Sequence, residues 1–376
     1  MKRLACLVTF VLIGCNMSPV GFGGLQNRVP AVRLDSLRAD SMAGFSRLVP
    51  LSSGQQMYVG QDSLYRSRAL CRFALPDTLT LTAIQAVRLV LHPVDSTAGM
   101  KFVCRPCSTE WDSSAATWYM ADGGSHWYTP GGDFWPVDVA TGNLQGESVV
   151  VDLRYRDLEE PVREAVRLNG IFLLPDIDTG IVAVWSAGAT AAKRPRIRVS
   201  YSGGAEKSFD ATVTTTLVDT MPRTVSPFDL LVGAGVAFRT WLRFRLDSIP
   251  REATIARADL FLRVEPKYMH QESVALSIRR LTESFGAKGV YAQFEALPSA
   301  SRYYRPGDTL VRFDIRSLVQ YWTSQRDRLG QGTGNFGLLV MAEPEWTRPF
   351  RVRVTRSGVR APRLDVEFVM PPEGRF

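Results

Sequence analysis

The chain has 376 residues, of which 45% are hydrophobic and 22% are charged, and its formal net charge is +8 at pH 7. This length is too great for one ordinary domain and suits two of about 150 to 170 residues, while the balanced composition excludes a wholly disordered chain. The basic residues permit contact with anionic glycans or lipid head groups. Because they are scattered along the sequence, they favour a solvated surface, and we expect no nucleic-acid partner.

The N-terminus has the pattern of a bacterial lipoprotein signal. Lys2 and Arg3 precede an apolar run, Leu4–Ile13, which is too short to span a bilayer and suits the core of a signal peptide. The run ends in LIGC, which is similar to a lipobox, so we expect cleavage before Cys15 and lipid on its thiol. An ordinary cleaved signal with an incidental cysteine is the alternative. Asn16 is not the aspartate that retains some lipoproteins at the inner membrane, so we expect the outer membrane.

Alternating strand patterns begin after a stretch in which Gly and Pro break any period. Apolar side chains occupy every second position in Cys71–Leu75 and again in Val87–Leu91. Such alternation is typical of strands that bury one face of an antiparallel sheet.

Three cysteines remain outside the signal. Cys104 and Cys107 have the spacing of a redox motif, but their segment is extended and lacks the helix start that stabilises a thiolate. Cys71 lies on the core side of its strand, so we expect structural cysteines, with room for one disulfide among the three in an exported chain. The three histidines share no metal-ligand spacing, so no metal or other cofactor is predicted.

A glycine-rich segment that follows these cysteines carries several aromatic rings. Exposed on a loop, the rings would stack on the apolar faces of sugars, with Asp122 and Asp133 as hydrogen-bonding partners. Folded back, they would instead cover one end of the sandwich as ordinary buried aromatics. The candidate ligand-binding rings are Trp118, Tyr119, Trp127, Tyr128, Phe134 and Trp135.

The strand pattern occurs twice. The segment CRFALPDTLTLTAIQAVRLVL recurs as LRFRLDSIPREATIARADLFL, so that Phe73 corresponds to Phe244. Later blocks repeat in the same order: VVVDLRYRDL as LVRFDIRSLVQYW, NGIFLLP as FGLLVMA, and RPRIRVSY as APRLDVEF. A short helix is expected after Asp152 and Asp314, where an aspartate near the helix start favours the helix dipole. The repeated order excludes chance and indicates two copies of one module.

The many short strands with Gly and Pro turns predict an all-β chain of two tandem antiparallel β-sandwich domains, jelly-roll-like in form. The expected boundaries are a lipoprotein signal peptide at 1–15, a flexible tether at 16–45, a first module at 46–202, a linker at 203–209, a second module at 210–370 and a tail at 371–376.

These blocks resemble a known family. LCRFALP, AIQAVRLVL, STEWDSSAATW, VVVDL, NGIFLLP and RPRIRVSY are similar to a DNRLRE-type domain, and so to carbohydrate-binding module family 96. The second copy matches through WLRFRLDSIPREATIARADLFL, VRFDIRSLVQYW, FGLLV and APRLDVEF, and the resemblance covers about residues 45 to 370. It implies β-sandwich modules of a bacterial surface or secreted protein. The hexapeptide DNRLRE is absent, and the second copy keeps only Glu283 of the Trp-rich stretch.

Arginines alternate in Arg194–Arg198, Arg243–Arg245 and Arg351–Arg353. Such rows could bind the carboxylates or sulfates of an acidic polysaccharide. The alternative is that they only keep a sheet face soluble and block edge pairing. A glycosidase would need two carboxylates that face each other. Glu110 and Asp112 would share a strand face, but Asp112 has no counterpart in the second copy. The sequence also contains no GxSxG, HExxH or P-loop pattern.

We therefore expect no enzymatic activity. The expected function is that of a lipid-anchored envelope protein whose two modules bind carbohydrate or another surface partner, where two weak sites on one tether gain avidity. The alternatives are a purely structural or adhesive surface protein and, third, a polysaccharide hydrolase or lyase.

Overall fold

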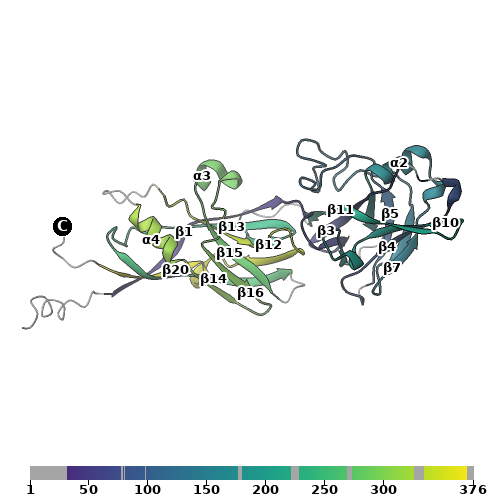
Figure 1. Cartoon of the computed structure of the whole chain (residues 1–376). Helices are drawn as coiled ribbons and strands as arrows, with labels where there is room; N and C mark the ends of the chain where they lie inside the picture. The colour runs from purple at the N-terminus through teal and green to yellow at the C-terminus, as the bar shows by residue number, and fades with distance from the viewer. Residues whose placement is uncertain are drawn as a thin grey trace, which may run out of the picture.

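The computed structural model describes residues 32–370 except 78, 80, 98, 177–179, 222–227, 269–272 and 326–333. The predicted signal, the lipidation site Cys15 and the tail lie outside the described residues. Two bodies of antiparallel strands lie end to end (Figure 1). The predicted all-β fold of two antiparallel sandwiches is therefore confirmed. None of the helices in the described ranges has the length and apolar character needed to cross a membrane.

The first module is built on a ten-stranded set that runs from β2 to β11. Helix α2 (Glu160–Leu168) follows β7, as the sequence predicts for the segment after Asp152. The strands are β2 (Gln56–Gln61), β3 (Tyr65–Phe73), β4 (Ile84–Leu91), β5 (Lys101–Pro106), β6 (Ala140–Asn143), β7 (Val149–Asp152), β8 (Ile171–Pro175), β9 (Gly180–Trp185), β10 (Arg196–Tyr201) and β11 (Glu206–Thr220), with short 3-10 turns at Leu81–Ala83, Tyr155–Asp157 and Ala191–Lys193.

The second module is also a ten-stranded set, and it includes the first strand of the chain. Helix α4 (Arg316–Ser324) begins directly after Asp314, whose carboxylate accepts the backbone N–H of Arg316 at 3.0 Å. The other elements are β1 (Val32–Leu48), β12 (Leu230–Ala234), β13 (Val236–Phe244), β14 (Thr254–Tyr268), β15 (Val274–Arg280), α3 (Phe285–Lys288), β16 (Ala300–Tyr304), β17 (Leu310–Asp314), β18 (Leu338–Ala342), β19 (Phe350–Val354) and β20 (Arg363–Val369), with 3-10 turns at Gly289–Tyr291 and Gly358–Arg360.

Each module has its own hydrophobic core between its sheets. Cys71 and Phe73 point into the first core from β3, and Leu242 and Phe244 point into the second core from β13. All four are fully or almost fully buried. Because alternate residues of a strand face opposite sides, the period-two pattern in the sequence places these side chains correctly. Burial of each large apolar side chain contributes about 1.5 to 3 kcal/mol, so two separate cores are well supported.

One long strand in each module joins its two sheets. In the first module, residues 206–210 of β11 pair with β10, and residues 211–220 pair with β3 after a register shift between Ala211 and Val213. In the second module, residues 32–38 of β1 pair with β20, and residues 39–48 pair with β13. Strands that change sheets at a bulge are a common way to close the corner of a sandwich.

These pairings correct the predicted boundaries at two places. Residues 32–45, which we expect to be a flexible tether, lie in β1 and belong to the second module. Residues 206–220, assigned to the linker and the start of the second module, lie in β11 and complete the first module. The sequence conceals both strands because their hydrogen-bonding partners are distant in the chain. In β1, charged residues interrupt the apolar alternation, and the residues packed against the core are Leu37, Ala39 and Met42.

The two modules share a buried cluster where they meet. It includes Tyr65 and Val218 from the first module with Leu231 and Phe238 from the second. The hydroxyl of Tyr65 donates a hydrogen bond to the carbonyl of Phe350 at 3.3 Å, across the boundary. The modules therefore pack against each other, and the first module is inserted between β1 and β12 of the second.

Candidate functional site

The aromatic segment of the first module folds over the outer face of the sheet formed by β3, β5 and β8. Its rings form a cluster with side chains of that face, including Leu70 and Phe172. Trp118 is 1% exposed and Trp127 is 4% exposed. The hypothesis of an exposed row of rings is therefore wrong for these two residues, and the alternative, in which the segment covers the sandwich, describes them. The physical reason is that β3 and β8 present apolar side chains on their outer face as well.

The remaining predicted rings differ in their surroundings. Tyr128 is 94% exposed, whereas Phe134 and Trp135 are half-buried. Tyr119 is half-buried as well, and its hydroxyl donates to the carboxylate of Asp219 at 3.1 Å. The six rings thus do not form one continuous stacking surface.

The two aspartates of the segment shape its backbone. Asp133 is buried, and its carboxylate accepts the backbone N–H groups of Tyr128 and Thr129 and the hydroxyl of Thr109. Asp122 accepts backbone N–H groups of the turn that follows it. Both carboxylates therefore stabilise the conformation of the loop. This structural role accounts for Asp122 and Asp133 without the contacts to sugar hydroxyls that the sequence suggests.

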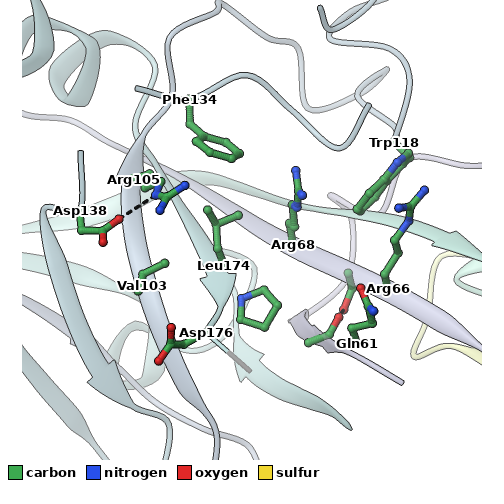
Figure 2. Close-up of a pocket in the computed structure, with 13 residues that line it drawn as sticks. Gln61, Arg66, Arg68, Val103, Arg105, Trp118, Phe134, Asp138, Leu174 and Asp176 are labelled. Carbon is green, nitrogen blue, oxygen red and sulfur yellow. Dashed lines mark hydrogen bonds and ion pairs between the residues drawn. The ribbon is translucent and has the colours of Figure 1, made fainter. Parts of the chain in front are cut away.

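A pocket of about 390 Å³ opens between this loop and the sheet beneath it (Figure 2). This volume is within the range of small-ligand sites. Two of the predicted rings, Trp118 and Phe134, contribute to its wall. The pocket is lined by Gly60, Gln61, Arg66, Ser67, Arg68, Val103, Arg105, Trp118, Phe134, Asp138, Leu174, Pro175 and Asp176.

Three arginines give the pocket its chemical character. Arg66 and Arg68 are two residues apart on β3, so they project from the same face, and Arg105 projects from β5. Arg66 donates to the carboxylate of Asp219 at 2.7 Å, and Arg105 donates to Asp138 at 2.7 Å. Among the described residues, Arg68 forms no ion pair with a carboxylate.

Arg68 lies between two aromatic rings (Figure 2). Its guanidinium carbon is 5.0 Å from the ring centre of Trp118 and 5.6 Å from that of Phe134, and one N–H group donates to the carbonyl of Gly131 at 2.8 Å. Burial, followed by the neighbouring charges of Arg66 and Arg105, lowers the pKa of Arg68 to about 10. A half-buried cation without a counter-ion favours binding of an anion.

The second module contains the same arrangement. Arg239 occupies on β13 the position that Arg68 occupies on β3, since both pair with the long strand at equivalent registers. Phe294 corresponds to Phe134, because each forms an isolated bridge with the residue that follows the matching strand, Leu281 after β15 and Cys107 after β5. The guanidinium of Arg239 lies 5.0 Å from the ring of Phe294.

The protein's own carboxylates neutralise the arginines of this second arrangement. Arg239 donates two hydrogen bonds, of 2.8 and 2.7 Å, to the carboxylate of Glu345, and both side chains are buried. Arg279, which corresponds to Arg105, is similarly paired with Glu343 at 2.9 and 2.7 Å. In the second module, a carboxylate of the protein itself therefore binds the arginine beside the ring of Phe294. In the first module, no carboxylate among the described residues binds the equivalent Arg68.

The arginine rows singled out in the sequence have structural partners. Arg196 pairs with Asp210, Arg243 with Asp40, and Arg353 with Asp229. The pocket arginines were not among the site residues predicted from the sequence, although the alternation in YRSRALCRF places Arg66 and Arg68 opposite the core face of β3. That alternation was the available signal. The loop that turns them into a pocket is distant in sequence.

The three described cysteines are buried free thiols. Burial raises the pKa of Cys107 to about 12 and raises the pKa values of Cys71 and Cys104 further. A raised pKa opposes the thiolate that redox chemistry requires. No metal-binding group of three or more His, Cys, Asp or Glu side chains occurs in the described part of the chain.

Comparison with known proteins found similarity in structure but not in sequence. No family model matches the chain, and no curated protein matches its sequence. Among solved structures, it is similar to the N-terminal CBM22-1–CBM22-2 tandem domain of Xyn10C from Paenibacillus barcinonensis, with 8% identity, 91% of this chain and 92% of that chain covered, and a TM-score of 0.15. At this TM-score the likeness carries no argument about arrangement or ligand, so the pocket itself is the basis for a function.

Proposed function

We propose that this chain is a lipid-anchored envelope protein whose first module binds an anionic carbohydrate in the Arg68 pocket without catalysing its cleavage. The observation that carries the proposal is the position of Arg68, a half-buried cation between two rings with no carboxylate partner among the described residues. The resemblance to carbohydrate-binding modules in the sequence supports the same class of ligand.

The chemistry of the pocket suits an acidic sugar. A guanidinium binds a carboxylate or sulfate through paired hydrogen bonds, and the ring of Phe134 offers an apolar surface to the C–H groups of a pyranose.

The second module supplies an internal comparison. There the carboxylate of Glu345 binds the arginine that corresponds to Arg68, beside the ring of Phe294. We take this contact as a stand-in for the carboxylate of a ligand in the first module. Because Glu345 already occupies the second arrangement, the proposal places binding in the first module alone.

The test is a binding measurement with soluble polysaccharides that differ only in charge. We expect affinity electrophoresis and calorimetry to show binding to a polyuronate or a sulfated glycan and none to a neutral glucan of the same length. The variant Arg68→Met is expected to lose at least tenfold in affinity, since it removes a charge-assisted contact worth about 1.5 to 3 kcal/mol.

Matched variants separate the pocket from general charge. Arg198→Met removes an exposed arginine of the first module that lies 3.8 Å from Glu206, and it is expected to leave affinity unchanged. Tyr128→Ala removes the exposed ring and is also expected to have no effect. Equal losses in Arg68→Met and Arg198→Met would contradict the proposal, because binding would then depend only on net charge.

The competing function is a structural or adhesive surface protein without a glycan site. Failure to bind any charged or neutral polysaccharide would favour it. Release of reducing ends from a polysaccharide panel would instead favour a hydrolase or lyase.

A further inference from the structure

We infer that the second module is a rigid stalk: it binds the N-terminal segment of the chain as one of its own strands and stands between residue 32 and the first module, which carries the pocket. This goes beyond ligand binding, because it assigns a function to the module whose arginines are already neutralised. It rests on the proposed lipid anchor only where it states which end faces the membrane.

The first step is that β1 fills a required position in the second module. In the first module that position belongs to β11, which joins β10 to β3. In the second module β1 joins β20 to β13, with its register shift between Ala39 and Ser41 at the equivalent place. A sandwich without this strand would leave the edges of both sheets open, which native proteins avoid.

The second step is that β1 is firmly held. The seventeen residues of β1 pair from Val32, opposite Val369, to Leu48, opposite Val236. Side chains add to the ladder: Asp40 accepts from Arg243 at 2.8 Å, and the hydroxyl of Ser36 donates to Asp365 at 2.7 Å. A segment with these contacts is a structural strand rather than a tether.

The third step is direction. Figure 1 shows β1 running along the second module toward the first module, so its start lies at the far end of the second module. At about 3.3 Å per residue, a strand of this length spans roughly 50 Å. The same residues as a flexible coil would have a mean end-to-end distance of only about 23 Å, with a broad distribution.

The consequence is an orientation opposite to the order of the sequence. The first module follows β1 in the chain, yet the second module surrounds β1 and stands between residue 32 and the pocket. Anything attached to the N-terminus therefore meets the second module first. With a lipid at Cys15, the stalk lies next to the membrane and the pocket lies away from it.

The first experiment uses pulsed electron spin resonance on the soluble chain that starts at residue 16. One spin label is placed on β1 by Leu34→Cys and the other on the first module by Gly123→Cys, two exposed positions. We expect one narrow, long distance. A broad distribution centred on a short distance, as a flexible tether would give, overturns the inference.

A variant adds a control for β1 itself. Leu37→Pro removes a ladder position opposite Leu364 and is expected to broaden the distance between residues 34 and 123. A second label pair within the first module, at Gly123 and Gly203, is expected to remain narrow. If the first distance also stays narrow in Leu37→Pro, pairing of β1 does not hold the segment and the inference fails.

The second experiment tests orientation with the full lipidated chain in phosphatidylethanolamine and phosphatidylglycerol vesicles that contain a lipid bearing an energy-transfer acceptor. A donor dye is placed at Glu252→Cys, which lies beside Thr254 at the same end as Val32, or at Gly123→Cys. We expect several-fold stronger transfer from residue 252. Equal or reversed transfer overturns the inference, whereas a chain that does not bind vesicles contradicts the proposed anchor and leaves the spin-label result to decide the stalk.

Discussion

Arg68 and Arg239 occupy equivalent positions in two copies of one fold, but only Arg239 has a carboxylate partner among the described residues, the buried Glu345. The two copies of the module thus carry the same arginine, one with and one without a carboxylate partner among the described residues. Glu345 lies in the connection between β18 and β19, residues 343–349, which is longer than the matching connection at 176–179 in the first module.

The two arginines should respond differently to the same substitution. Arg239→Met leaves the buried carboxylate of Glu345 unpaired, so we expect a loss of about 3 to 5 kcal/mol in the free energy of unfolding. Arg68→Met removes a cation with no such partner, and we expect a change within about 1 kcal/mol. Urea unfolding of the two variants measures both values. A loss in Arg68→Met as large as in Arg239→Met would show that Arg68 is also paired with a carboxylate.

The affinity for an anionic glycan should fall at alkaline pH. The pKa of Arg68 is lowered to about 10, so its guanidinium is fully charged at pH 7 and loses its proton as the pH rises through that value. Because the ligand binds the charged form, we expect constant affinity from pH 6 to about 9 and a decline above pH 10. Calorimetry at these pH values checks the profile. Affinity that stays constant to pH 11 in the unmodified protein would contradict a lowered pKa for Arg68, and Arg68→Met should lack the decline.

The packing of β1 against the second module predicts a steric effect at Gly44. A β-carbon at this glycine would lie 2.0 Å from the carbonyl oxygen of Asp229, closer than any real contact. We expect Gly44→Ala to lower the free energy of unfolding by about 2 kcal/mol, since the backbone must shift to relieve the overlap. Gly203→Ala, at a glycine with open space around it, is the control and should be nearly neutral. Equal stability of the two variants would mean that β1 does not pack here.

The position of β11 predicts where the first module ends. A fragment of residues 49–220 keeps β11, whereas a fragment of residues 49–202 loses it and exposes the edges of β3 and β10. We expect cooperative thermal unfolding only for the longer fragment, because open sheet edges and a one-sided core favour aggregation. Circular dichroism and size-exclusion chromatography compare them. Cooperative unfolding of the shorter fragment would place the boundary where the sequence pattern suggests.

The sequence alone predicts much of the fold. Period-two alternation identifies strands such as β3 and β13, and the repeated blocks identify the duplication. Both signals are local, because a strand that buries one face must alternate along its own length. The same logic fails for β1, in which the exposed charges of a strand at the corner of two sheets resemble a solvated tether.

Only some of the pocket residues could be predicted from the sequence, because the pocket also depends on contacts between distant segments. Trp118 and Phe134 are recognisable as unusual rings in a loop, but whether a ring faces solvent or a sheet depends on what lies beneath it. Arg68 and Arg105 come from strands more than thirty positions apart in the chain, and only the pairing of β5 with β8 and of β8 with β3 brings them to one face.

The sequence by itself thus determined the strand content, the two cores and the doubling of the module, because each depends on the order of apolar and polar residues along a short segment. Tertiary structure alone decided which module contains β1 and β11, which of the two equivalent arginines is paired with a buried glutamate, and on which module the pocket lies. These properties depend on hydrogen-bonding partners and counter-ions that lie far apart in the chain, and no local pattern records such distances.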